Sequence, residues 1–90
     1  MRVYRLSPIL NSEMDPAWQY TKIKFEDCWV LAETDEDARQ KVALATKEDS
    51  PQASSKSAWM QKHLAECFED ANKPLCYGIV VSASGSFTVK

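Results

Sequence analysis

The segment from position 28 to position 39 constrains this fold most, because a strand leads directly into a helix within it. Every residue of 28–32 (Cys-Trp-Val-Leu-Ala) is apolar, so both faces of this strand are apolar. Such a strand is typical of the centre of a sheet that is covered on both sides. Thr34 is a good helix N-cap, and the three acids at 35–37 place negative charge at the positive end of the helix dipole. We therefore expect a central strand followed by a helix over about 35–47.

The exposed side of this helix contains two acid-before-base pairs. Asp35 and Arg39 are four residues apart, as are Asp37 and Lys41. Pairs of opposite charge at this spacing are neighbours on a helix surface, and each stabilises the helix by about 0.2–0.5 kcal/mol. The pattern predicts both ion pairs.

Several other segments show the period-two alternation of strands. Apolar and polar residues alternate over 3–6 and 21–26, and apolar residues mark two further strands at 77–83 and 87–89. The segment 59–70 fits two patterns. Trp59, His63, Leu64, Cys67 and Phe68 would share one face of a helix, whereas Leu64, Glu66 and Phe68 would alternate on a strand.

Together these patterns predict an α+β fold. We expect an antiparallel sheet of about four strands with one helix at about 35–47 packed on one face and, in the helical alternative, a second short helix near 59–70. The 90 residues form a single domain, 1–90, with a flexible polar loop at about 47–58.

Composition narrows the functional classes. A net charge of −2 favours neither a basic nucleic-acid surface nor a strongly acidic mimic of DNA. Three cysteines without paired spacing are typical of a reducing compartment. No signal peptide is predicted at the start, and the longest apolar run, 79–81, is too short to cross a bilayer. We expect a cytoplasmic protein that has no contact with a membrane.

Several short motifs spread over most of the chain resemble those of a protein group. They are Arg2-Val3-Tyr4-Arg5-Leu6, Asp15-Pro16-Ala17-Trp18, Val30-Leu31-Ala32-Glu33-Thr34 and Glu36-Asp37-Ala38-Arg39. The chain resembles a group of small uncharacterised bacterial and phage-type proteins with the pattern RVYRL…DP-W…V-A-E/S…EAR. The group has no established activity. The resemblance supports the fold and favours a strand around Cys67.

The residues that could carry chemistry are few. On a helix, His63 and Cys67 would be adjacent, and Cys28 and Cys76 could complete a metal site, but the close-spaced ligand pairs typical of structural zinc are missing from the sequence. A cysteine nucleophile activated by His63 has no supporting local motif. The acids at 27 and 35–37 could form a carboxylate cluster, but helix capping explains three of the four. We expect no catalytic residues, no metal and no cofactor.

Nucleic-acid binding also has weak support. Lys22 and Lys24 alternate with Ile23 and Phe25, near Tyr20. A stacking surface needs aromatic side chains on the same face as the cations. Alternation places Phe25 on the face opposite the lysines, so a nucleic-acid partner is not expected.

The tryptophans give the main functional expectation. Trp18, Trp29 and Trp59 are many for a small core, and aromatic residues are enriched at the centres of interfaces. Trp29 and Leu31 occupy the strand face that a single helix on the other side cannot cover. Three things could cover it: the chain's own long loops that carry Trp18 and Trp59, a second copy of the chain, or a foreign protein. We predict a small non-catalytic domain that binds a protein partner, or forms a homodimer, through Trp29, Leu31, Trp18 and Trp59.

Within this class, an inhibitor from a phage or host-defence system, such as an anti-CRISPR-like protein, is one hypothesis by analogy of size and fold. The alternative is a small metal-binding or cysteine-dependent enzyme that uses His63 with Cys67 or Cys76.

Overall fold

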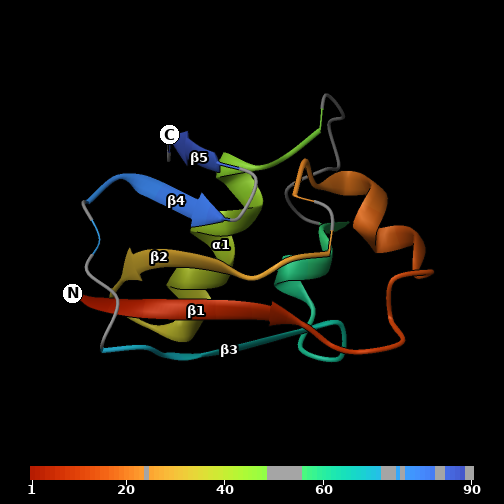
Figure 1. The fold of residues 1–90 in the computed structure, drawn as a ribbon, viewed down its shortest axis with the longest axis horizontal. Coiled ribbons are helices and arrows are strands. Elements are labelled where there is room, and N and C mark those ends of the chain that lie inside the picture. Colours follow the sequence, from red (N-terminus) through yellow and green to blue (C-terminus); the bar gives the residue numbers. More distant parts are fainter. Residues whose placement is uncertain (24, 49–55, 72–74, 76, 83–84, 89–90) are drawn as a thin grey trace.

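The described residues form one antiparallel sheet with an α-helix on one of its faces (Figure 1). The computed structural model describes residues 1–23, 25–48, 56–71, 75, 77–82 and 85–88. In chain order the elements are β1 (Arg2–Pro8), the 3-10 helix η1 (Pro16–Tyr20), β2 (Cys28–Ala32), α1 (Asp35–Ala45), the 3-10 helix η2 (Ala58–Met60), β3 (Ala65–Glu69), β4 (Ile79–Ser82) and β5 (Gly85–Thr88). The order of these five described strands is β3-β1-β2-β4-β5. The predicted α+β class is confirmed, with one strand more than the four or so expected.

β2 lies in the middle of the sheet, between β1 and β4, as its apolar character predicted. Leu6 lies opposite Cys28, and Val30 lies opposite both Tyr4 and Val80. These five side chains are buried and belong to the same core cluster as the apolar residues of α1. The core therefore fills the space between the sheet and α1.

The start of α1 follows the sequence prediction closely. The Thr34 hydroxyl accepts a hydrogen bond from the Asp37 amide at 3.1 Å, and the Asp37 carboxylate accepts one from the Glu33 amide at 3.0 Å. The Lys41 ammonium lies 3.1 Å from the same carboxylate, which confirms that predicted ion pair. The helix ends at Ala45, two residues before the expected limit.

The predicted ion pair between Asp35 and Arg39 is wrong. Arg39 is only 6% exposed, and its Nη1 donates a hydrogen bond to the Trp59 carbonyl at 3.0 Å. The Asp35 carboxylate instead accepts a hydrogen bond from the Glu36 amide at 2.9 Å. The spacing rule treats a helix as isolated, whereas η2 packs against α1 and provides an acceptor for the arginine.

The strand predicted at 21–26 is wrong for the described part of that segment. Thr21 forms an isolated bridge with Lys47, and Phe25 has a φ of +54°, which lies in the left-handed region. The alternation of apolar and polar residues reflects which side chains are buried, and it does not reflect strand pairing. Thr21 and Ile23 are fully buried, but they enter the core from a loop.

The second half of the ambiguous segment 59–70 is a strand. Of the second short helix considered there, only the 3-10 turn η2 is formed, and β3 follows it. β3 pairs with β1, with Cys67 opposite Leu6. The strand alternative around Cys67 is therefore confirmed.

The predicted loop at 47–58 is described only at its ends. Residues 49–55 lie outside the described residues. Lys47 is held by its bridge to Thr21, and Ser57 is fully buried and caps η2 through its hydroxyl.

Candidate functional site

The face of the sheet turned away from α1 carries half-buried apolar side chains and an arginine. Successive residues of a strand point to opposite faces, so the register assigns every described strand residue to one face or the other. Figure 1 shows α1 behind the sheet, on the side opposite this face. We call it the open face, and its described residues are Val3, Arg5, Ser7, Trp29, Leu31, Glu66, Phe68, Ile79, Val81, Ser86 and Thr88.

Arg5 lies on the open face in β1, which is the middle one of the three adjacent strands β3, β1 and β2. It lies opposite Trp29 on one side and opposite Phe68 on the other. Its Cζ atom is 5.6 Å from the centroid of the Trp29 ring and 5.7 Å from that of the Phe68 ring. At these distances each aromatic ring attracts the cation, by about 0.5–1 kcal/mol at an exposed site.

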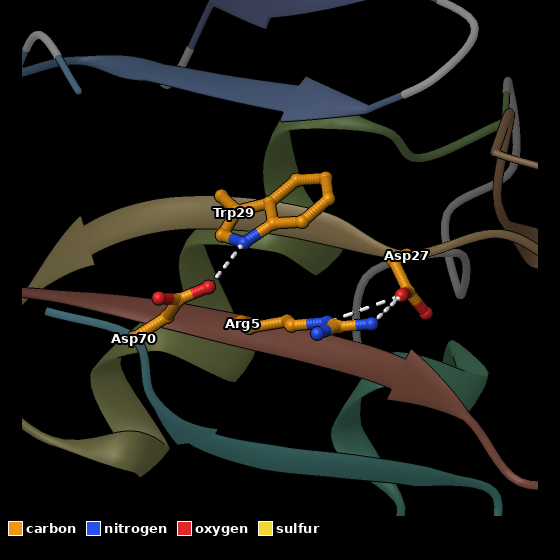
Figure 2. A network of polar contacts seen from close by, with 4 residues as sticks. All are labelled: Arg5, Asp27, Trp29 and Asp70. Carbon is orange, nitrogen blue, oxygen red and sulfur yellow. Dashed lines mark hydrogen bonds and ion pairs between the residues drawn. The ribbon is translucent and has the colours of Figure 1, made fainter. Parts of the chain in front are cut away.

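Arg5 is also held by an acid, as Figure 2 shows. Its Nε donates a hydrogen bond to the Asp27 carboxylate at 3.1 Å, and its Nη2 donates to the same oxygen. Asp27 immediately precedes β2, so the ion pair ties the start of β2 to the middle of β1. The guanidinium is therefore fixed in direction rather than free to rotate.

The Trp29 indole is fixed in a similar way (Figure 2). Its Nε1 donates a hydrogen bond to the Asp70 carboxylate at 3.0 Å. Asp70 follows β3, and its amide donates to the Val3 carbonyl at 2.9 Å. Trp29 is half-buried, so part of the ring remains accessible. Side chains held in one geometry lose little conformational entropy when a partner binds.

A shallow hollow adjoins the open face at the start of β1. It has a volume of about 320 Å³, and it is lined by Met1, Arg2, Val3, Leu31, Glu69 and Ala71. Val3 and Leu31 belong to the open face, so the hollow continues it. An ion pair of 2.8 Å between Arg2 and Glu69 lies at its polar side.

Two of the four residues predicted to bind a partner lie in the core instead of on the open face. Trp18 is 7% exposed and Trp59 is fully buried. Their rings meet edge to face, with centroids 5.0 Å apart, and the Trp59 Nε1 donates a hydrogen bond to the Thr21 hydroxyl at 2.9 Å. Trp29 and Leu31 are the two predicted residues that the structure brings together on the open face.

Among the described residues, the candidate metal and nucleophile side chains are not assembled into a site. His63 is exposed and lies before β3, so it does not share a helical turn with Cys67. The Cys67 thiol donates to the Asp35 carbonyl at 3.8 Å, and burial raises its pKa to about 11. Burial also raises the pKa of Cys28 well above its usual range. Cys76 lies outside the described residues.

Within the described ranges, no group of three or more His, Cys, Asp and Glu side chains could hold a metal ion.

Where the structure describes them, the residues considered for nucleic-acid binding do not form a platform. Phe25 packs edge-on against Trp18, with ring centroids 5.3 Å apart, and Ile23 is buried. Lys22 is exposed on the loop, and Lys24 lies outside the described residues. The aromatic ring is thus part of the core cluster rather than a surface for stacking bases.

Sequence reasoning did not identify Arg5, Asp27, Phe68 or Asp70 as site residues. Arg5 alternates with Tyr4 and Leu6 in the sequence, so it shares a strand face with the apolar Val3. An arginine on an apolar strand face was the available signal. Its partners lie 22 to 63 residues away in sequence, so only strand pairing brings them to it.

The chain was compared with protein-family models, curated proteins and solved structures, and none of the three comparisons found a match. None of the helices in the described part of the chain is long and apolar enough to span a membrane.

Proposed function

We propose that this chain is a small non-catalytic domain that binds a foreign protein through the open face. One observation carries the proposal: α1 covers one side of the sheet, while the other side presents Trp29, Arg5 and Phe68 as one fixed cluster. Tryptophan and arginine are the residue types that most often dominate binding energy at protein interfaces.

The charges of the open face favour a partner with basic residues over a second copy of the chain. Around the aromatic cluster, the described residues contribute three carboxylates (Asp27, Glu66 and Asp70) and one guanidinium, that of Arg5. In a two-fold dimer the same patch meets itself, so like charges would approach one another. A partner with an apolar centre and a basic rim would complement this face.

Within this proposal, we propose that the chain inhibits a phage or host-defence system, in the manner of anti-CRISPR-like proteins. Its support is analogy with other small α+β inhibitors. Such inhibitors act by occupying a protein surface, which is the kind of contact that the open face offers.

The test begins with site-specific photo-crosslinking in cells. The photoreactive residue p-benzoylphenylalanine replaces Leu31 on the open face or, as a control, Leu44, which is 43% exposed on α1. The proposal expects an adduct with a foreign protein from position 31 and none from position 44.

The protein found in that adduct is then purified and titrated with the chain. Trp29→Ala is expected to weaken its binding about tenfold or more, whereas Leu44→Ala leaves it unchanged, and circular dichroism verifies that both variants fold. Three results would overturn the proposal: adducts that join two copies of the chain, equal adducts from both positions, or binding that survives Trp29→Ala.

A further inference from the structure

A second hollow lies on the other side of the molecule, between α1 and the segment that follows η2. Its volume is about 210 Å³, and it is lined by Glu36, Arg39, Gln40, Met60 and Lys62. It shares no lining residue with the open face and therefore constitutes a separate candidate site.

Arg39 is the unusual residue of this hollow. It is 6% exposed, its Nη1 donates to the Trp59 carbonyl, and its Nε is buried without a hydrogen-bond partner among the described residues. No carboxylate of the described residues lies within ion-pairing distance of the Arg39 guanidinium. Burying a charge without a counter-charge is unfavourable, so this cation would gain from an anion at the hollow.

The other lining side chains add to this preference. Lys62 contributes a second cation, and the Gln40 amide can donate hydrogen bonds. Glu36 is the opposing acid, which leaves one net positive charge in the hollow of a chain whose net charge is −2. The volume is below the roughly 300–1,000 Å³ of typical drug-sized sites, which limits the ligand to a small group.

We propose that this hollow binds a small oxyanion, the phosphate or carboxylate group of a small molecule. Arg39 supplies the buried charge, and guanidinium groups are well suited to both oxyanions. Lys62 strengthens the attraction from the rim, and the Gln40 amide orients the anion. Glu36 weakens binding by like-charge repulsion.

The experiment titrates the purified chain with inorganic phosphate and, separately, with acetate. Sodium chloride at equal ionic strength controls for screening. The readout is the ¹H–¹⁵N spectrum, in which the Arg39 Nε–H and the amides of Met60 and Lys62 report on the hollow. We expect saturable shifts of these signals, and a rise in melting temperature with ligand concentration. The anion that saturates at the lower concentration identifies the preferred ligand group.

Three variants separate a site from general charge attraction. Lys62→Ala is expected to raise the dissociation constant about two- to fivefold, and Glu36→Gln is expected to lower it by a similar factor. Lys22→Ala removes an exposed lysine outside the hollow and should change nothing. The proposal is overturned if chloride produces the same shifts, if the three variants behave alike, or if Glu36→Gln lowers stability without improving binding, since Glu36 would then be the counter-ion of Arg39.

Discussion

Arg5 connects three strands of the open face through a single side chain. The guanidinium lies between the Trp29 and Phe68 rings and is ion-paired to Asp27. The pair is about one-third exposed, so solvent screens it and the rings contribute a comparable share. Arg2 makes an ion pair on the same strand, but that pair is far more exposed.

Arg5→Ala should therefore lower the free energy of unfolding by about 1–2 kcal/mol, because it removes two cation–π contacts and a partly buried ion pair. Urea unfolding measures the change. Arg2→Ala is the matched control and should leave the unfolding midpoint unchanged. Equal effects of the two substitutions would contradict a special role for Arg5.

Cys67 should behave as an unreactive thiol at neutral pH. Its pKa is raised to about 11 by burial, so little thiolate exists in the folded protein below about pH 10. Its alkylation by iodoacetamide, followed by mass spectrometry of the Cys67 peptide, should accelerate about tenfold for each pH unit up to about 11. Rapid alkylation at pH 7.5 would instead support an activated cysteine.

The same shift affects stability with a definite sign. The folded state holds the Cys67 proton more tightly than the unfolded chain does, whose thiol has a pKa near 9.0. The contribution to stability is therefore complete below pH 9 and is lost as the pH rises toward 11. Cys67→Ser should reduce the loss of stability over this window.

Among the single elements, α1 and β3 form for different physical reasons. α1 begins at a local signal, because Thr34 and Asp37 cap its first turn within four residues of each other. β3 has no comparable local signal, and its conformation follows from its pairing with β1, about 60 residues earlier.

Thr34→Ala should lower the free energy of unfolding by about 1 kcal/mol, the usual effect of losing an N-cap side chain. Thr34→Asp, which restores a cap acceptor, is the control and should retain most of the stability. Thermal or urea unfolding measures both variants. If Thr34→Ala left stability unchanged, the contacts of α1 with the sheet would be sufficient to define its start.

At the scale of the whole molecule, the sheet separates two groups of aromatic residues. Trp18 and Trp59 pack together in the core with Phe25, whereas Trp29 and Phe68 flank Arg5 on the open face. The first group contributes mainly to folding, and the second lies on the face through which we propose that a partner binds.

This separation predicts unequal effects of the same substitution. Trp59→Phe should destabilise the fold by about 2–3 kcal/mol, because it leaves a cavity and removes the hydrogen bond to the buried Thr21 hydroxyl. Trp29→Phe keeps an aromatic ring on a half-exposed face and should cost about 1 kcal/mol or less. Urea unfolding compares the two, and the reverse order would contradict the assignment of the two groups.

The features that depend on neighbouring residues could be predicted from the amino-acid sequence. The two-sided apolar character of 28–32 predicted the central strand, and the acids after Thr34 predicted the start of α1. The face shared by Trp29 and Leu31 followed from simple alternation. Each of these signals acts within about four residues, so no knowledge of distant contacts was needed.

The other features of the fold depend on contacts between residues that are far apart in the sequence. The alternating segment from Thr21 became a loop, and Arg39 turned into the core, because distant elements offered them better partners. The cluster around Arg5 exists only because β1 pairs with both β2 and β3. Pairing between segments far apart in sequence depends on how the whole chain packs, and the local pattern of residues does not encode it.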